Sequence, residues 1–408
     1  MRNTSKRVSP AVTVIIMFGV ISLLGDVVYE AARGGNSQYL NLLGISASQV
    51  GLVFGLGEFL GYGIRLVSGL LIDKSKKHWL FMFIGYGMLL VVPLMGLTAD
   101  WNILVVLILA ERIGKALRSP AKDTILSEVA DKQVGIGFAF GLQEALDQIG
   151  AFLGPLLFTL VFFLAGKNGI AQYQAGYRLL VVPYVALIVF LTFVYIRVSA
   201  NRLAVPPDRR RHPQRLQPIF WMYTAFTFFC TLGFVNFSTI GYHLKAEDLL
   251  SDGNITLLYS LAMIVDAATA LAVGKIYDFA KEKLSRKAGG LLLLIVLPTL
   301  SCLLPILALS RKPSLIVAGM VVFGMIMGVQ ETVMRSAIAD VTPFDKRGTG
   351  YGVFNTSYGL ALMCGAGLMG WLYDKDLIWA IIVFSVAAEV IAAVLYGRLD
   401  VMVRKANA

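Results

Sequence analysis

Charged residues are scarce in this chain of 408 residues. Only 15% of the residues are Asp, Glu, Lys or Arg, whereas 57% are hydrophobic. Soluble domains contain roughly 25% charged and 45–50% apolar residues. The composition therefore excludes a water-soluble globular protein and indicates one that lies within a membrane.

Cysteine and histidine are also rare, with three of each. Cys230, Cys302 and Cys364 stand singly in separate apolar segments, so they form neither a disulfide framework nor a metal-ligand spacing. The chain also lacks the histidine pair of zinc proteases, the nucleophile elbow G-x-S-x-G and the nucleotide-binding P-loop. We therefore expect no metal, no cofactor, no enzymatic activity and no direct use of ATP.

Long apolar runs dominate the sequence. A helix needs about 20 mostly apolar residues to cross a bilayer, and hydropathy identifies about twelve such segments. Residues 291–300 and 103–110 do not alternate between apolar and polar types, which argues against barrel strands. We expect an all-α membrane protein with twelve transmembrane helices. The approximate spans are 11–32, 47–71, 79–98, 101–119, 136–164, 176–197, 218–240, 255–279, 289–309, 314–335, 348–372 and 377–397.

Basic residues give the chain a formal net charge of +11, and they concentrate in alternate loops. If the N-terminus lies in the cytoplasm, the inner loops hold basic clusters at 74–77, 209–215 and 281–287, while the outer loops hold few cations. This asymmetry predicts a multi-pass protein of the inner (cytoplasmic) membrane with both termini in the cytoplasm. The cations are expected to contact membrane lipids, and their distribution argues against a nucleic-acid partner.

The longest polar stretch divides the predicted spans into six and six. This stretch, from Arg197 to Pro218, contains four prolines and the cluster Arg209-Arg210-Arg211, which predicts a cytoplasmic linker. We expect an N-terminal six-helix bundle at 1–197, the linker at 198–217 and a C-terminal bundle at 218–408. A weak internal repeat supports two related halves, because Gly69-x-x-x-Asp73 is echoed by Gly274-x-x-x-Asp278.

A carboxylate and three lysines share the short loop after the second span. The segment reads Gly69-Leu-Leu-Ile-Asp73-Lys74-Ser75-Lys76-Lys77. It resembles the loop between helices 2 and 3 of the major facilitator superfamily, although Lys76 stands where that family usually has a second glycine. The segments ERIGKALRSPAKD (111–123) and GLQEALDQIGAFLGP (141–155) resemble a bacterial branch whose substrates we cannot assign. The resemblance implies two pseudo-symmetric six-helix bundles and transport by alternating access.

The same resemblance implies a gate at the cytoplasmic side. In the family, the carboxylate that corresponds to Asp73 contacts the partner bundle and stabilises the outward-facing state. We expect this gate to involve Gly69, Asp73, Lys74, Lys77 and Arg118.

The fifth span carries glycines at regular spacing. Gly141, Gly150, Gly154 and Pro155 resemble the first part of a motif typical of the superfamily's antiporters, although Phe158-Thr159 replaces its final glycine pair. Such glycines allow close helix contact, and the proline bends the helix. The motif favours export, while ordinary small-residue packing is the alternative interpretation.

Charged residues inside the spans are costly, at roughly 2.5–3.5 kcal/mol each, so they are candidates for function. We expect Glu144 and Asp147, three residues apart on one helix face, to form a protonatable site tuned by Arg112. Asp26 and Glu58 are further candidates for proton coupling. The alternative is a static buried ion pair, such as the i, i+4 pair of Glu111 and Lys115.

Repeated halves place a transporter's substrate at the midplane between them. We expect a cavity for a small to medium-sized amphipathic or weakly anionic solute. Its predicted lining is Arg112, Phe234, Gln330, Phe354, Asn355 and Tyr358.

Three functions follow from these patterns. The first is a secondary active transporter, acting as a monomer, that exchanges protons for a small organic solute or drug and exports it. The second is a symporter or facilitator that imports a sugar, an organic anion or an amino acid. The third is a membrane enzyme or sensor that transports nothing, which the intramembrane carboxylates and arginines disfavour.

Overall fold

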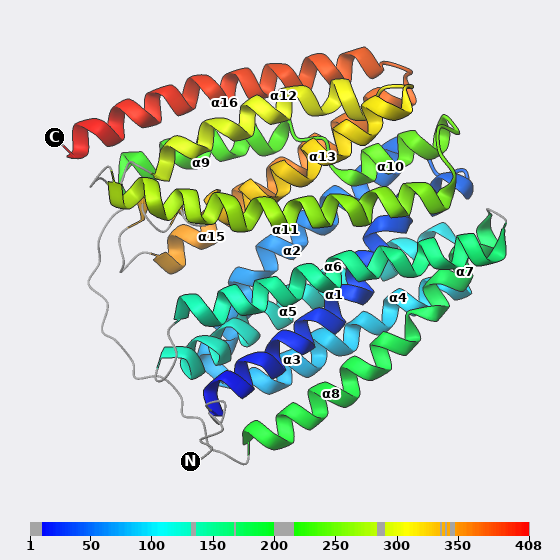
Figure 1. Ribbon diagram of the computed structural model, residues 1–408, viewed down its shortest axis with the longest axis horizontal. Coiled ribbons are helices and arrows are strands. Elements are labelled where there is room, and N and C mark those ends of the chain that lie inside the picture. Colours follow the sequence, from blue (N-terminus) through cyan, green and yellow to red (C-terminus); the bar gives the residue numbers. More distant parts are fainter. Residues whose placement is uncertain are drawn as a thin grey trace, which may run out of the picture.

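The described part of the chain folds entirely into helices (Figure 1). The computed structural model describes residues 10–131, 136–166, 169–199, 216–283, 290–334, 337–338, 341–342 and 347–407. Most of the predicted linker at 198–217 lies outside these ranges. Figure 1 shows two groups of helices that lie close together at one end and separate toward the end that carries both termini. We call these the closed end and the open end.

Six crossings form the N-terminal bundle. They are α1 (Pro10–Leu42), α2 (Ala47–Ser75), a third crossing built from α3 (His78–Gly87), η1 (Met88–Leu90), α4 (Val91–Leu94) and η2 (Met95–Leu97), then α5 (Trp101–Asp131), α6 (Ile136–Ala165), and a sixth crossing of α7 (Ile170–Leu179) and α8 (Val181–Ser199).

Six further crossings form the C-terminal bundle. They are α9 (Pro218–Leu232) with α10 (Phe237–Ala246), α11 (Asp252–Lys283), η3 (Gly290–Ile295) with α12 (Val296–Ala308), α13 (Pro313–Val329) with η4 (Gln330–Met334), α15 (Arg347–Asp374) and α16 (Ile378–Asn407). The fold is thus the predicted all-α membrane architecture with twelve crossings.

Ten of these crossings are long and apolar enough to span a membrane by hydropathy, in the ranges that the structure covers. The remaining two, α5 and α15, are more polar. Residues 111–123 of α5 include two acids and four cations, namely Glu111, Asp123, Arg112, Lys115, Arg118 and Lys122. Both helices line the space between the bundles, which explains why they need less apolar surface.

Several helices run past the ends of the predicted spans. Hydropathy places the end of the first span at residue 32, but α1 continues to Leu42 through Arg33 and Asn36. Likewise α5 reaches Asp131 rather than residue 119. A helix satisfies its own backbone hydrogen bonds, so polar side chains end the apolar signal without ending the helix.

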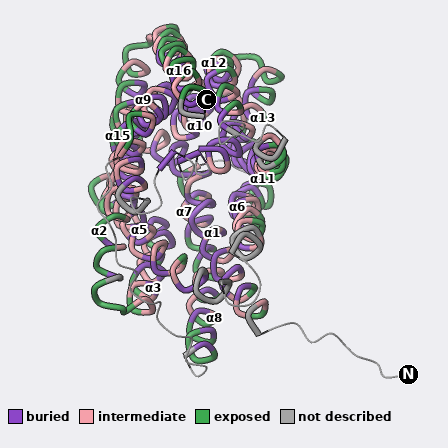
Figure 2. The backbone as a smooth tube through the Cα atoms, turned by 90° about the vertical axis from the view of Figure 1, so that its left-hand side faces the viewer, coloured by how far each residue is buried: buried purple, intermediate pink, exposed green. Residues whose placement is uncertain are grey.

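Each bundle has its own apolar core. One buried cluster contains mostly residues from Ile15 to Val198, and the other mostly residues from Phe220 to Val403. The outer faces are apolar but exposed, as at Val182, Val185 and Val189 on α8 (Figure 2). An exposed apolar face of this extent on a multi-crossing protein is the surface that contacts lipid.

Two helices change their course beside the space between the bundles. The seventh crossing breaks between Leu232 and Phe237, and the side chain of Asn236 caps α10 by accepting a hydrogen bond from the Thr239 backbone N–H. The tenth crossing ends in a π-helical turn at Gln330–Met334. Irregular backbone at membrane depth is tolerated where it lines a cavity, so both breaks point to the interior site.

Candidate functional site

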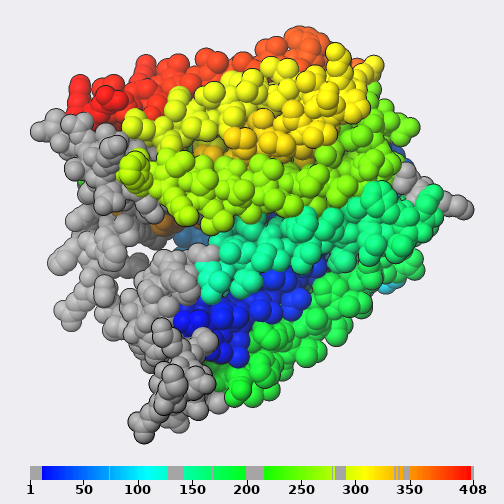
Figure 3. All heavy atoms as spheres, in the orientation of Figure 1, coloured from blue at the N-terminus to red at the C-terminus, as the bar shows by residue number. Residues whose placement is uncertain are grey.

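A cavity of about 1750 Å³ lies between the bundles. Its N-terminal wall comes from α1, α2, α5 and α6, and its C-terminal wall from the 234–238 break, α11, η4 and α15. The lining includes Gly69 near the end of α2 and Gly274 near the end of α11, so the cavity extends toward the open end. Figure 3 shows the bundles separating in that direction. All six residues predicted to line a cavity are among the lining residues.

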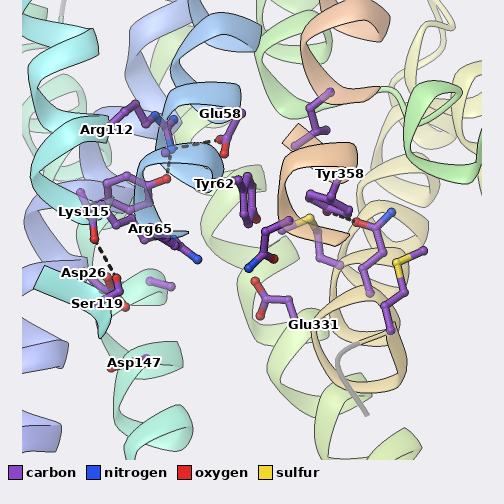
Figure 4. A pocket seen from close by; sticks show the side chains of 18 of the residues that line it. Asp26, Glu58, Tyr62, Arg65, Arg112, Lys115, Ser119, Asp147, Glu331 and Tyr358 are labelled. Atoms are coloured by element: carbon purple, nitrogen blue, oxygen red, sulfur yellow. Dashed lines mark hydrogen bonds and ion pairs between the residues drawn. The ribbon is translucent and has the colours of Figure 1, made fainter. Parts of the chain in front are cut away.

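Arg112 is the centre of a buried ion-pair group on the N-terminal wall (Figure 4). It is 4% exposed, and its guanidinium lies 3.0 Å from Glu58 and 3.4 Å from Glu111. It also donates a hydrogen bond to the hydroxyl of Tyr29. These contacts compensate the charge of Arg112 within the protein.

Asp147 has a different cationic partner from the predicted one. The sequence suggested Arg112, but Lys122 lies 3.7 Å from Asp147 and also donates a hydrogen bond of 2.6 Å to Ser22. Lys122 is ten residues beyond Arg112 on α5, which corresponds to roughly 15 Å along the helix. Asp147 sits level with Lys122, and Arg112 sits level with Glu58 on α2. Lys122 is therefore the cation in contact with Asp147.

Glu144 belongs to a hydrogen-bonded link between the bundles. The side-chain amide of Gln148 lies 3.4 Å from Glu144 and 3.3 Å from Glu331. Asp26 also lines the cavity, as do Glu144, Asp147 and Glu58. The five residues proposed for proton coupling therefore face one space, in which Glu58 contacts Arg112 and Asp147 contacts Lys122.

Three further cations of this wall lie over aromatic rings. Lys115 Nζ is 3.6 Å from the ring centroid of Tyr29, and the Arg118 guanidinium is 4.9 Å from that of Tyr86. Arg65 lies 4.9 Å from the ring of Tyr62 (Figure 4). Such cation–π contacts stabilise charge away from water.

The C-terminal wall is aromatic. Tyr358 donates a hydrogen bond of 3.0 Å to Gln330 and stacks on Phe354 at 6.0 Å between centroids. Across the cavity, Tyr62 of α2 meets Tyr358 edge to face at 5.0 Å. Glu331 and Asp266 add carboxylates to this wall. Both residues stand inside predicted spans, at 255–279 and 314–335, but no sequence pattern indicated that they share one wall.

The gate residues predicted from the loop after α2 lie near the open end. Lys74 and Lys77 are exposed, while Arg118 is 4% exposed and lines the cavity. The side chain of Asp73 lies outside the described residues. Lys76 closes α2 with φ of 57°, a conformation that glycine adopts with less strain. This explains why a glycine is common at the corresponding position of the resembled family.

The glycines of α6 lie against α1. A side chain at Gly154 would meet the carbonyl oxygen of Val27 at 2.6 Å, and one at Gly150 would clash with that of Leu23. Gly141 lies in α6, but its surroundings are outside the described part of the chain. Pro155 packs beside Gly34 of α1. The glycines of this motif thus bring α6 close to a helix of its own bundle.

Several hydrogen bonds join the two bundles at the closed end. Asp374, the last residue of α15, accepts hydrogen bonds from the backbone N–H groups of Ala47 at 2.8 Å and Ser48 at 2.9 Å. The hydroxyl of Tyr242 donates to the carbonyl of Ile45 at 2.9 Å. Deeper inside, Tyr259 donates to Glu30 at 2.6 Å. These contacts hold the bundles together and close the cavity at this end of the molecule.

Known proteins resemble this chain in sequence and in fold. An uncharacterised protein of Mycobacterium tuberculosis is 36% identical over 390 residues, which cover 93% of this chain and 91% of the relative. An uncharacterised MFS-type transporter of Methanocaldococcus jannaschii is 25% identical, with 88% of each chain covered.

Solved transporters share the fold at low sequence identity. A mutant of the nucleoside transporter NupG has a TM-score of 0.72 at 11% identity, over 95% of this chain and 99% of that one. A bacterial homologue of the human lysosomal transporter Spinster, in an inward-facing and unoccupied conformation, has a TM-score of 0.66 at 14% identity, over 98% of both chains. The profile of the Major Facilitator Superfamily matches residues 11–297 and 246–407. The chain is a membrane transporter that belongs to the major facilitator superfamily.

Proposed function

We propose that this transporter exports a small organic solute from the cytoplasm in exchange for protons, by alternating access. The observation that carries the proposal is the pair of Asp147 and Lys122 at 3.7 Å inside the cavity. Asp147 Oδ1 is buried and has no hydrogen-bond partner among the described residues. Protonation would neutralise the carboxylate and release Lys122, so one proton changes the charge that the cavity presents.

The proposed direction of transport rests on the basic loops of the sequence and on the position of the open end in the structure. The basic loops support a cytoplasmic location of both termini in a protein of the inner membrane. The open end carries the termini (Figure 1), so this structure would be an inward-open state with its closed end toward the outside. The partial antiporter motif of α6 supports exchange rather than symport, and the complete cavity within one chain supports a monomer as the working unit.

The coupling of solute transport to protons can be tested by the direction in which protons move when solute enters a vesicle. Purified protein is reconstituted into liposomes that contain a pH-sensitive dye, and candidate solutes are added outside without an imposed gradient. An antiporter drives protons out of the vesicle as solute enters, whereas a symporter carries both in the same direction. Inward proton movement would overturn the exchange proposal and favour the import of a nutrient; solute flux without proton movement would indicate a facilitator.

Two variants locate the proton site. Asp147→Asn should retain solute-for-solute exchange across the membrane while losing proton movement, because the exchange needs no net protonation. Glu389→Gln is the matched control, since Glu389 is a fully buried carboxyl of α16 away from the cavity lining. Equal proton movement in both variants would show that Asp147 does not carry the coupled proton.

A further inference from the structure

The charges around the cavity are distributed unequally between its two walls. Among the described lining residues, the N-terminal bundle supplies six basic and six acidic side chains, which balance. The C-terminal bundle supplies two carboxylates, Asp266 and Glu331, and no cation within the same described set. The basic residues are Arg33, Arg65, Arg112, Lys115, Arg118 and Lys122.

The N-terminal wall does not require an anionic substrate. Arg112 is held between Glu58 and Glu111, and Lys122 contacts Asp147. Arg33 lies 3.5 Å from Glu30 and 3.9 Å from Glu58. Because Arg112, Lys122 and Arg33 already contact carboxylates, a substrate carboxylate would have to displace an existing ion pair to bind them. The other three lining cations, Lys115, Arg118 and Arg65, lie over the rings of Tyr29, Tyr86 and Tyr62.

Asp266 differs from these cations in its surroundings. It is 2% exposed, and its Oδ1 atom is buried without a hydrogen-bond partner among the described residues. The charged groups that act on it most strongly are the carboxylates Glu331, Glu144 and Glu30, with Arg33 as the opposing cation. A buried carboxylate surrounded mainly by other acids is costly unless a proton or a cation neutralises it.

The packing of α11 against the tenth crossing places the two acids near each other. Gly328 of α13 leaves room for the backbone of Asp266, whose carbonyl oxygen would lie 2.6 Å from a side chain at that position. Glu331 follows one helical turn later, in the π-helical segment η4, and Figure 4 shows it beside the cavity. Two carboxylates from adjacent helices can therefore approach one ligand group.

The wall that holds this pair of acids is rich in aromatic and thioether side chains. Phe234, Phe237, Phe354 and Tyr358 line the same wall, together with Met263 and Met327. Aromatic faces attract organic cations, most strongly where water is excluded. Methionine adapts its shape to ligands of varied outline. The wall thus combines negative charge with apolar, polarizable surface.

We propose that the substrate is a hydrophobic organic cation, such as an aromatic amine, whose charged group lies at Asp266 and Glu331 and whose apolar part packs on the aromatic C-terminal wall. This inference rests on the proposed transport function and names its substrate class. It replaces the amphipathic or weakly anionic solute expected from Arg112, because the carboxylates beside Arg112 already compensate its charge.

Two probes of equal shape and opposite charge test the substrate class. Tetraphenylphosphonium is a permanent aromatic cation, and tetraphenylborate is its anionic counterpart. Binding of each is measured to the full-length protein in nanodiscs of zwitterionic lipid, and binding to empty nanodiscs is subtracted. We expect the cation to bind at least tenfold more tightly than the anion. Equal binding, or tighter binding of the anion, would overturn the proposal.

Variants then test whether Asp266 and Glu331 bind the charged group of the substrate. Asp266→Asn and Glu331→Gln should each weaken binding of the phosphonium at least tenfold, while Asp266→Glu, which keeps the charge, should retain most of it. Glu389→Gln, with its carboxyl outside the cavity, should bind like the unaltered protein. Each variant is compared only after its thermal stability matches, and unchanged binding in Asp266→Asn would contradict the assigned site.

The failure of this inference can be distinguished from failure of the transport proposal. If another solute exchanges with protons in liposomes while tetraphenylphosphonium neither binds nor is transported, the substrate class is wrong and the exchange mechanism stands. If the phosphonium binds through Asp266 but moves without protons, the site is supported and the coupling is wrong.

Discussion

The carboxylate of Asp374 caps the helix that begins at Ala47, although the two residues belong to different bundles. Asp374 Oδ1 accepts the backbone N–H of Ala47 at 2.8 Å, and Oδ2 accepts the backbone N–H and hydroxyl of Ser48. The N-terminus of a helix carries partial positive charge and unsatisfied N–H groups, so a carboxylate there is stabilising. The end of α15 is thereby attached to the start of α2 at the closed end.

Asp374→Ala should loosen the closed end. The loss of a helix cap costs about 1 kcal/mol, which would shift a two-state equilibrium several-fold toward separation of the bundles at this end. The distance between spin labels at exposed positions Asn102 and Ser251, which both lie at the closed end, reports the shift. Asp376→Asn, two residues further on, is the matched control. An unchanged distance distribution in Asp374→Ala would show that the cap does not hold this end together.

The cap should not respond to pH in the physiological range. Burial acts to raise the pKa of Asp374, but hydrogen bonds from Ser48 and Ala47 outweigh it, so the pKa lies below its ordinary value. A lowered pKa means that the stabilisation is complete above the ordinary value and is lost only as pH falls through the lowered one. The label distance should stay constant between about pH 5 and pH 8. A transition near neutral pH would indicate that another group controls the closed end.

Hydropathy predicts the twelve crossings because each residue's transfer free energy depends on its own side chain. The partners of the charged residues depend instead on helix tilt and on which turns of neighbouring helices are level. That is why Asp147 contacts Lys122, which was not a predicted site residue, rather than the predicted Arg112. The link between Asp374 and Ala47 spans most of the chain and leaves no local pattern. The sequence therefore predicts which residues face the cavity better than it predicts their pairing.

Close contact of α2 and α15 requires glycine at defined positions. A side chain at Gly370 would clash with the carbonyl oxygen of Ala47, whereas one at Gly367 would meet nothing within 4 Å. Gly370→Ala should therefore separate the helices and destabilise the closed state by about 1–3 kcal/mol. Gly367→Ala on the same helix should be neutral. The measurement is transport rate together with the label distance, and equal behaviour of the two variants would refute the packing argument.

The contact of Arg112 with Glu58 should show as a coupling energy. In a double-mutant cycle of Arg112→Gln and Glu58→Gln, we expect the double variant to be more stable than the sum of the single changes implies, by at least about 1 kcal/mol. Stability is measured by thermal unfolding in detergent. The cycle of Glu58→Gln with Lys122→Gln is the control, because Lys122 contacts Asp147 instead. Additive effects in the first cycle would mean that the ion pair contributes nothing.

Asn355 and Gln330 should be reachable by water-soluble reagents from the open end. Both line the cavity, yet Gln330 is only 4% exposed and is held by Tyr358, so it should react more slowly than Asn355. We expect a thiol reagent to label Asn355→Cys and Gln330→Cys in a variant without the three native cysteines. A bound substrate should slow both reactions, because it would fill the space that the reagent must enter.

Ser385→Cys is the control, since Ser385 is fully buried and donates a hydrogen bond to the Gly233 carbonyl outside the cavity lining. Labelling of Ser385→Cys as fast as of Asn355→Cys would show that the reagent enters the bundle generally, and an absence of labelling at both cavity positions would place them against packed helix rather than in the substrate path.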